Sequence, residues 1–172
     1  MKIYTLKSKQ LLPISLDEAW KFLSDPANLK VITPDYMSFD ILSGADRPMF
    51  EGQIIQYIVT PIAGIKTKWV TEITHVKDKE FFVDEQRFGP YSLWHHKHFL
   101  KEVKGGVEME DIVDYKLPMG FLGIMVHPFL VKPKLKEIFD YRQKMLIELF
   151  GEFSTSAEAK TSISEKEEQA SN

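Results

Sequence analysis

Hydrophobic and polar residues alternate along much of the chain up to position 117, and a period of two predicts β-strands. Short, turn-like connections such as Gly89-Pro90 and Gly105-Gly106 separate the later strands, which predicts an antiparallel meander. The expected strands cover residues 2–12, 36–42, 53–60, 66–76, 81–88, 91–100 and 107–117.

Two short helices are predicted between the first two strands. Ser15 and Glu18 form a capping box, in which the Ser15 hydroxyl accepts a hydrogen bond from the Glu18 amide and the Glu18 carboxylate reaches back. Asp25 and Pro26 start the second helix as its cap and its first-turn residue. Pro34 ends that helix, because the residue before a proline disfavours helical dihedral angles.

The period changes after position 120. Residues 121–131 are apolar but interrupted by Pro128, which predicts a short helical or irregular lead-in. From residue 134 the apolar positions recur every three or four residues, which predicts an amphipathic helix that ends near Gly151. The expected fold class is therefore α+β, a curved antiparallel sheet of about seven strands covered by one long C-terminal helix. We expect a single domain over residues 1–152 and a disordered polar tail over residues 153–172.

Composition narrows the classes of function. The 172 residues are 44% hydrophobic and 12% aromatic, which suits one domain with a large apolar interior. A net charge of -3 gives no basic field for a nucleic acid, so no nucleic-acid partner is expected. The absence of Cys excludes disulfides and thiolate chemistry. Residues 1–13 lack the apolar run of a signal peptide, and no segment is long enough for a membrane span. A cytoplasmic protein without stable membrane insertion is expected.

The turns suggest a strand register. If Gly89-Pro90 is a tight turn, Glu85 lies opposite Trp94; if Gly105-Gly106 is another, Leu100 lies opposite Asp111. Both registers place the same set of residues on one face, and the opposite face is more polar, so this set is expected to point inward. The set comprises Phe81, Val83, Glu85, Arg87, Trp94, His96, His98, Leu100, Met109, Asp111, Val113 and Tyr115.

Acids, imidazoles and a phenol on a concave face are too polar for a dry core, because an unpaired buried charge costs several kcal/mol. Such groups either satisfy each other in a structural network or line a cavity and orient a mostly apolar ligand. Arg142, within the apolar stripe of the last helix, either extends to solvent or reaches an inward carboxylate. The expected ligand-contacting residues are Trp69, Glu85, Arg87, Trp94, His96, His98, Met109, Asp111, Val113, Tyr115 and Arg142.

His96 and His98 allow two further interpretations. Two histidines at i and i+2 on a strand point the same way and, with Glu85 or Asp111 as a third ligand, could bind a metal ion. A hydrogen-bonded pair of histidines explains the same spacing. We therefore predict no metal and no cofactor. The candidate catalytic residues are Glu85, His96, His98 and Asp111, working as a carboxylate–histidine acid–base pair. His127 is expected to be a surface or capping residue.

Several motifs together resemble one superfamily. They are Trp20-Lys-Phe-Leu-Ser-Asp-Pro-Ala-Asn28, Thr33-Pro34, Phe82-Val-Asp-Glu-Gln86, Gly89-Pro90-Tyr91, Trp94-x-His96-x-His98-Phe99, Met109-x-Asp111-x-Val113-x-Tyr115 and Phe139-Asp-Tyr-Arg142. With these motifs the chain resembles the SRPBCC superfamily of START-like helix-grip proteins, and within it the small bacterial ligand-binding proteins related to polyketide cyclases and dehydrases. The resemblance implies a helix-grip fold with an elongated cavity that binds a hydrophobic or amphiphilic small molecule. It carries no reaction over, because fold alone does not decide function.

Two hypotheses from different classes follow. Binding of a hydrophobic small molecule without catalysis is favoured. The alternative is a cyclase, dehydratase or hydrolase that uses a carboxylate–histidine pair in the same cavity. A third possibility, a module that binds another protein, has no positive signal in the sequence, and a protein partner stays unknown.

Overall fold

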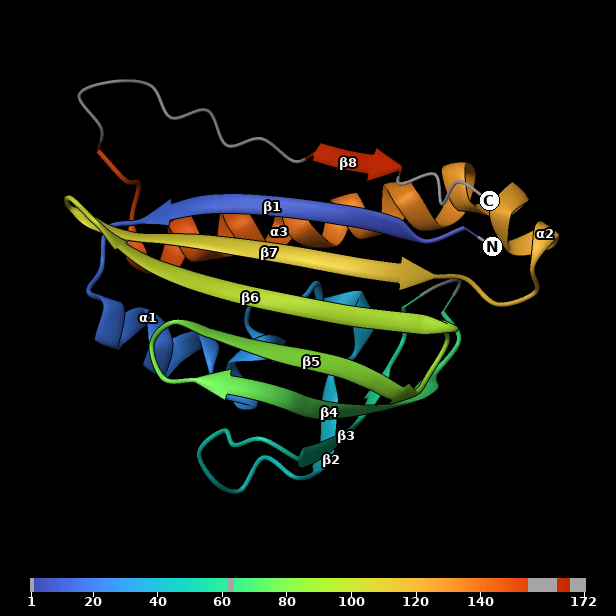
Figure 1. Cartoon of the computed structure of the whole chain (residues 1–172), viewed down its shortest axis with the longest axis horizontal. Helices are drawn as coiled ribbons and strands as arrows, with labels where there is room; N and C mark the ends of the chain where they lie inside the picture. Colours follow the sequence, from blue (N-terminus) through green and yellow to red (C-terminus); the bar gives the residue numbers. More distant parts are fainter. Residues whose placement is uncertain (1, 62–63, 155–163, 168–172) are drawn as a thin grey trace.

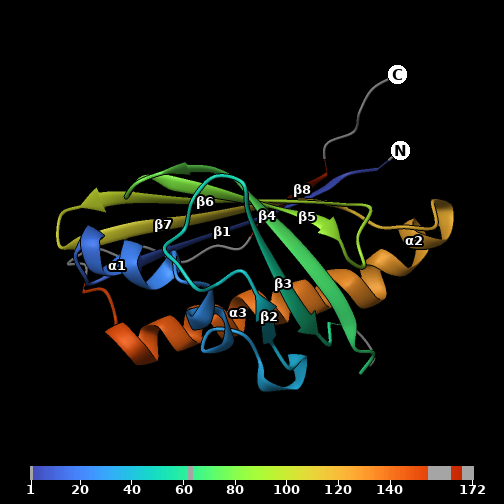
Figure 2. The same ribbon diagram turned by 90° about the horizontal axis from the view of Figure 1, so that it is seen from below.

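A curved antiparallel sheet wraps around one long helix, as the sequence predicts (Figures 1 and 2). The computed structural model describes residues 2–61, 64–154 and 164–167. The strand order across the sheet is β2-β3-β4-β5-β6-β7-β1-β8. The strands are β1 (Tyr4–Leu12), β2 (Asp40–Ser43), β3 (Gln53–Val59), β4 (Thr67–Lys77), β5 (Phe81–Phe88), β6 (Leu93–Val103), β7 (Gly106–Lys116) and β8 (Ser164–Glu167).

Both short helices after β1 form where the caps predict them. Helix α1 (Leu16–Leu23) begins at Ser15, whose side chain accepts a hydrogen bond from the Glu18 amide, 3.2 Å away. The 3-10 helix η1 (Pro26–Lys30) begins at Asp25, which accepts from the Ala27 amide. The predicted strand over residues 36–42 is mostly wrong. Its first part is the 3-10 helix η2 (Asp35–Met37), and the strand β2 starts only at Asp40.

The C-terminal helical segment is continuous in the chain. It consists of α2 (Phe121–Val126), the π-helical turn η3 (His127–Val131) and α3 (Lys132–Phe150), after which Gly151 adopts φ 90°. Helix α3 runs along the sheet and covers its concave face (Figure 2). Its buried side chains recur at helical spacing and are Leu135, Phe139, Arg142 and Leu146.

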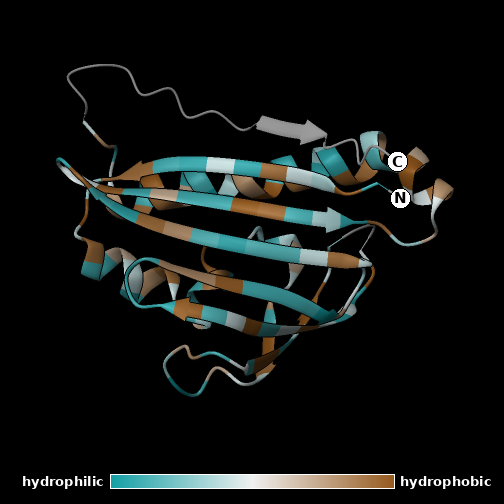
Figure 3. Cartoon of the chain, in the orientation of Figure 1, coloured by the Kyte–Doolittle hydropathy of each residue, from teal (hydrophilic) through white to brown (hydrophobic). Residues whose placement is uncertain are grey.

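The neighbouring strands β7 and β1 follow the predicted alternation. Every second residue of β7, from Val107 to Tyr115, is buried, and β1 alternates almost as regularly. Figure 3 colours these strands in both hydrophobic and hydrophilic bands. The buried side carries polar residues as well, namely Ser8, Gln10 and Asp111. Burial of the apolar side is the main contribution that holds the sheet against α3, at about 25 cal/mol per Å² of apolar surface.

The lead-in to α3 is helical but leaves most of its apolar side chains in solvent. Phe121 is 72% exposed and Phe129 is 85% exposed, whereas the buried residues of the segment are Gly123, His127 and Val131. The expectation of a short helical lead-in is therefore met in the backbone, but only a few of its side chains pack against the domain.

The domain boundary at residue 152 stays a prediction. Of the polar tail expected over residues 153–172, residues 155–163 and 168–172 lie outside the described residues. The described piece of that tail, β8, pairs antiparallel with β1, with Tyr4 opposite Glu167. Among the described residues, no helix is long and apolar enough to cross a membrane.

Candidate functional site

The register of β5 against β6 decides which acidic residue faces the concave side. Asp84 lies opposite His96 and Glu85 lies opposite His95, so the predicted pairing of Glu85 with Trp94 is wrong by one residue. The connection is wider than a tight turn, because the Gln86 side chain bonds both the amide and the carbonyl of Tyr91 and closes a loop. Since successive side chains point to opposite faces, this shift turns every predicted side chain of β5 over.

Glu85 and Arg87 therefore lie on the outer face, and their predicted inward position is wrong. Glu85 Oε1 is 3.2 Å from His95 Nδ1, and the Arg87 guanidinium contacts Glu72 at 2.5 Å and Glu85 at 3.3 Å. These pairs are partly exposed and contribute little to stability, on the order of 0–1 kcal/mol each. Phe81 and Val83 change faces with Glu85.

The register of β6 against β7 also differs from the prediction, but by two residues, which keeps each side chain on its predicted face. The connecting loop is Lys104-Gly105, with Val103 opposite Gly106, rather than Gly105-Gly106. His98 consequently lies opposite Asp111. Gly105, at φ 94°, supplies the left-handed backbone that this tight loop requires.

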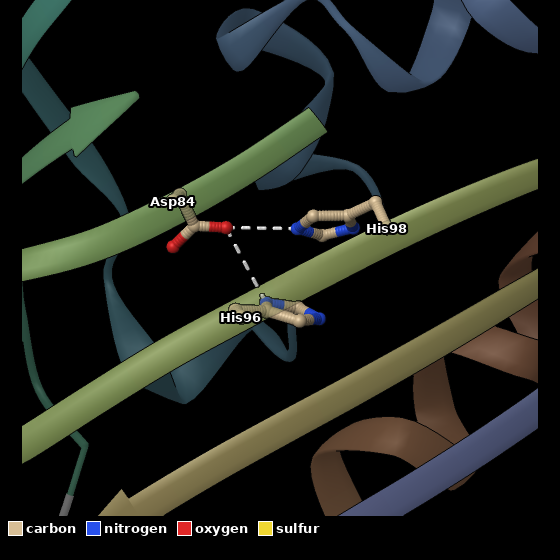
Figure 4. A group of neighbouring side chains, drawn as sticks. All are labelled: Asp84, His96 and His98. Atoms are coloured by element: carbon tan, nitrogen blue, oxygen red, sulfur yellow. Dashed lines mark hydrogen bonds and ion pairs between the residues drawn. The ribbon is translucent and has the colours of Figure 1, made fainter. Parts of the chain in front are cut away.

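Three side chains from the two neighbouring strands converge at the middle of the concave face (Figure 4). Asp84 Oδ2 is 2.8 Å from His98 Nε2 and 3.5 Å from His96 Nδ1. The two imidazole rings lie beside each other, with centroids 3.7 Å apart. His98 also stacks on Phe82, with ring centroids 4.0 Å apart and an interplanar angle of 16°. Strand pairing and aromatic packing thus fix the positions of both imidazoles.

A fourth group, Asp111 on β7, holds the far side of both rings. Its Oδ1 atom is 3.1 Å from His96 Nε2 and 2.8 Å from His98 Nδ1, and 3.5 Å from Arg142 Nη1 on α3. The Asp111 side chain has no solvent exposure. Three buried polar atoms of the cluster, within the part of the chain that the structure describes, have no hydrogen-bond partner of good geometry: Asp111 Oδ2, His98 Nδ1 and Arg142 Nε.

The charges of these groups are mutually dependent. Burial would raise the pKa of Asp111, but Arg142 and the two histidines outweigh it and hold that pKa well below its usual value. Burial likewise opposes ionisation of Asp84, and the histidines and Arg142 lower its pKa nonetheless. The pKa of His96 is lowered, first by burial and then by the charge of His98.

His98 behaves in the opposite way. Burial would lower its pKa, but its contacts with Asp111 and Asp84 raise it above the ordinary value of 6.5. Of the two imidazoles, His98 therefore has the higher pKa, because it lies between two carboxylates. With His98 protonated and His96 neutral, the charges of Asp84, Asp111, His98 and Arg142 cancel.

A cavity of about 180 Å³ lies between the sheet and α3. Five of the predicted contact residues line it, namely Trp69, Trp94, His96, His98 and Arg142. From the apolar stripe of the last helix, Leu135, Ile138 and Phe139 also line it, as expected of that stripe. The other lining residues, none of them predicted as contacts, are Leu23, Pro26, Leu29, Ile32, Thr33, Met37, Phe39, Met49, Ile55, Tyr57, Val59, Pro61, Thr71, Ile73, Phe82, Asp84 and Tyr91.

The remaining predicted contact residues do not line this cavity. Met109 and Val113 pack in the hydrophobic core with 1% and 0% exposure, and Asp111 lies behind the histidines. The Tyr115 hydroxyl is 2.7 Å from His127 Nε2, and His127 stacks on Tyr4 with ring centroids 3.5 Å apart. The expected surface position of His127 is therefore wrong. Its imidazole lies inside because the buried Tyr115 hydroxyl bonds with it.

No protein-family profile matches the chain, and no curated protein matches it either. Solved structures share its fold. Protein CV1439 from Chromobacterium violaceum is 12% identical with a TM-score of 0.66, and the match covers 86% of this chain and 96% of that one. Ara h 8.0201 is 16% identical with a TM-score of 0.56, over 85% of this chain and 99% of that one.

A norcoclaurine synthase point mutant from Thalictrum flavum, in complex with a transition state analogue, is 13% identical with a TM-score of 0.60. That match covers 87% of this chain and 98% of the synthase. At such identities the likeness establishes the fold alone, a curved antiparallel sheet gripping one long C-terminal helix. It agrees with the resemblance that the sequence motifs indicate.

Proposed function

We propose that this chain binds a small, mostly apolar molecule in the cavity between the sheet and α3. The observation that carries the proposal is that the cavity wall is mostly apolar and has its ionisable side chains gathered in one cluster. Most lining side chains are aliphatic or aromatic, while the ionisable groups that line it are Asp84, His96, His98 and Arg142, all members of one cluster. Binding pockets typically combine an apolar lining with a few polar groups that orient the ligand.

The size of the cavity limits the ligand. A cavity needs a volume of about 10–15 Å³ to hold one water molecule, and an engineered cavity of about 150 Å³ in another protein binds benzene. A volume of about 180 Å³ therefore suits a molecule of one or two rings, or an aliphatic chain of similar bulk. Trp69 and Trp94 lie edge to face with centroids 5.3 Å apart and offer aromatic contacts to it.

The polar end of the ligand is expected to be a hydrogen-bond acceptor. Arg142 lines the cavity, is 7% exposed, and its buried Nε has no hydrogen-bond partner among the described residues. An unsatisfied buried donor costs about 1–3 kcal/mol, which a ligand oxygen would recover. A carboxylate or phenolate oxygen next to Arg142 is the simplest acceptor.

The first experiment looks for a ligand that the protein already carries. Purified protein is extracted with organic solvent and the extract is analysed by mass spectrometry, alongside native mass spectrometry of the intact protein. We expect one apolar compound of the size given above, in stoichiometric amount. A second experiment compares two probes by calorimetry, naphthalene-1-carboxylate and 1-methylnaphthalene, and the carboxylate is expected to bind at least about tenfold more tightly because of Arg142.

Two variants on the same helix make the test specific. Ile138 lines the cavity, so Ile138→Trp fills it and should abolish probe binding. Ile147 is 39% exposed, so Ile147→Trp should leave the affinity unchanged. Equal affinities for the wild type and both variants would show that the probe binds elsewhere and would remove the proposal.

One observation favours a second candidate, an acid–base enzyme that acts in the same cavity. Asp84 and His98 are 2.8 Å apart and both line the cavity, which is the contact that such chemistry requires. Both nitrogens of His98 face carboxylates, so Asp84 would exchange the proton with the bound ligand through its other oxygen, and His98 would hold that carboxylate in place. The test incubates candidate small cyclisable or hydratable ligands with the protein and follows turnover; loss of turnover in His98→Gln, without loss of ligand binding, would establish it.

We infer that the chain is a small ligand-binding member of the SRPBCC superfamily and that it works in the cytoplasm. The sequence motifs and the shared helix-grip fold support the first part. Fractionation of cells that express the chain at its natural level tests the second.

A further inference from the structure

We propose that Asp84, His96 and His98 form a binding site for a divalent transition-metal ion. The metal-binding atoms would be a carboxylate oxygen of Asp84, Nδ1 of His96 and Nε2 of His98. One donor atom from each of these residues lies within 4.8 Å of the others (Figure 4). The proposal goes beyond ligand binding in the cavity and does not depend on it.

The spacing of the donor atoms suits a shared ion. Zinc binds nitrogen and oxygen ligands at about 2.0–2.2 Å, so two ligands of one tetrahedral ion are about 3.3–3.5 Å apart. Asp84 Oδ2 is 2.8 Å from His98 Nε2 and 3.5 Å from His96 Nδ1. The third separation, between the two histidine nitrogens, is bounded only by the 4.8 Å that contains the group. Side-chain adjustments on the order of 1 Å would therefore place all three atoms around one ion. Neither strand would have to move.

The second argument is the carboxylate behind the histidines. A histidine that binds a metal through one nitrogen usually donates its other N–H to a carboxylate or carbonyl, which fixes the ring and its tautomer. Asp111 Oδ1 makes this hydrogen bond with His96 Nε2, at 3.1 Å. The same oxygen is 2.8 Å from His98 Nδ1, where the present angle is not that of a hydrogen bond, so the His98 ring would have to turn slightly to donate to it. Arg142 in turn contacts Asp111. The nitrogens that point away from Asp111 are the two that face Asp84.

The charge balance and the chemistry of the donors indicate the kind of metal. With both imidazoles neutral, as metal ligands must be, the two carboxylates outnumber the one guanidinium, so the cluster presents a net negative charge to an incoming cation. A bound divalent ion would leave one excess positive charge, which an anionic ligand in the cavity would balance. Two imidazoles and one carboxylate, without a thiolate, suit Zn²⁺, Co²⁺ or Fe²⁺ rather than Cu⁺ or Ca²⁺. Because all three residues line the cavity, the remaining coordination positions would face it and could take a ligand oxygen.

The test uses the full chain without an affinity tag, dialysed against a chelator and then titrated with Zn²⁺ and Co²⁺ by calorimetry. One ion per chain with a dissociation constant in the micromolar range or below is expected. X-ray absorption of the Zn²⁺-loaded wild type should show two imidazole ligands, and this readout does not depend on any variant. Absence of binding up to millimolar metal, or a spectrum with fewer than two imidazoles, would overturn the proposal.

Variants then locate the ion. Asp84→Asn and His98→Gln each replace a metal ligand by a side chain of similar shape and should weaken Co²⁺ binding at least about 100-fold. Asp111→Asn should weaken it about 10–100-fold, because it removes the carboxylate that orients the imidazole rings. The matched control is His95→Gln, which removes the histidine of the Glu85–His95 pair on the opposite face of the same strands. Far-ultraviolet circular dichroism checks that each variant is folded. Unchanged affinity in Asp84→Asn, or equal loss in His95→Gln, would contradict the assignment.

Discussion

Arg142 on α3 and Asp111 on β7 form a buried ion pair, with Nη1 3.5 Å from Oδ1, that joins the long helix to the middle of the sheet. Removing one partner of such a pair leaves an uncompensated charge, which typically costs about 3–5 kcal/mol. We therefore expect Arg142→Met to lower the free energy of unfolding of the metal-free protein by about 3 kcal/mol or more, measured by urea denaturation.

Two further variants serve as controls for this prediction. Lys144→Met removes an exposed partner of Glu148 on the same helix and should change the free energy of unfolding by less than about 0.5 kcal/mol. The double variant Arg142→Met/Asp111→Asn leaves no unpaired charge at this contact and should be more stable than Arg142→Met alone. If the single and double variants are equally stable, the two side chains do not interact.

Asp84 should control the proton of His98. In metal-free protein, Asp84→Asn removes one of the two carboxylates that raise the pKa of His98, so that pKa should fall. Nuclear magnetic resonance of the imidazole nitrogens across a pH titration measures it directly. The control variant Glu85→Gln changes the neighbouring acid on the outer face and should leave the pKa of His98 where it was.

Acid should destabilise the metal-free protein through Asp84 and Asp111. Both have a folded-state pKa below the ordinary value of 3.8, so their contribution to stability is complete above about pH 4 and is lost as pH falls through the folded-state values. Urea denaturation at pH 2.5, 3.5, 4.5 and 7 should show a steep loss for the wild type below about pH 4. Asp111→Asn should start lower at pH 7 and show a shallower loss; an identical slope would contradict the assignment.

Near pH 6.5 the two histidines should act in opposite directions. The folded-state pKa of His96 is lowered, so its contribution falls as pH drops below about 6.5, because the unfolded chain then binds the extra proton. The folded-state pKa of His98 is raised, so its contribution is present below about 6.5 and is lost as pH rises through the folded value. His96→Gln and His98→Gln should therefore change the slope of metal-free stability against pH with opposite signs between pH 5.5 and 8.

Two residues of the lead-in to α3, the buried Val131 and the exposed Phe129, should contribute very differently to stability. Val131 is 3% exposed, so Val131→Ala should cost about 2 kcal/mol of stability through lost burial and the cavity left behind. Phe129 is 85% exposed, so Phe129→Ala should stay within about 0.5 kcal/mol of the wild type although it removes a larger side chain. Thermal unfolding of the two variants side by side measures the difference.

The fold was largely predictable because β7, β6 and α3 each have a regular pattern. Alternation from Val107 to Tyr115 assigns the faces of β7 unambiguously, and the helical spacing of α3 assigns its buried side. The two-residue error in the predicted β6–β7 register did not change the predicted faces, because a shift by an even number of residues leaves each side chain on the same side of the sheet. It preserved every face, and so His96, His98 and Asp111 were correctly predicted to point inward.

The candidate site was only half predictable because β5 lacks such a pattern. Phe81, Phe82 and Val83 are all hydrophobic, so alternation cannot choose between its two faces, and only the assumed tight turn at Gly89-Pro90 did so. The structure replaces that turn with a loop closed by the Gln86 side chain, and it adds an irregularity to the β4–β5 ladder between Ile73 and His75. Such long-range geometry leaves no mark in local spacing, which is why Glu85 was chosen in place of Asp84.

Asp84, His96 and His98 are all carried by neighbouring strands and none of them by a loop. Some cavity-lining residues, such as Met49 and Pro61, lie in connections between strands, so redesign of these connections should alter the cavity wall without moving the three polar side chains. Conversely, a single-residue insertion inside β5 would send the carboxylate to the outer surface and dismantle the constellation at once. The fold thus separates a polar cluster held by paired strands from cavity walls that depend partly on the connections, which makes the scaffold a practical starting point for engineered receptors.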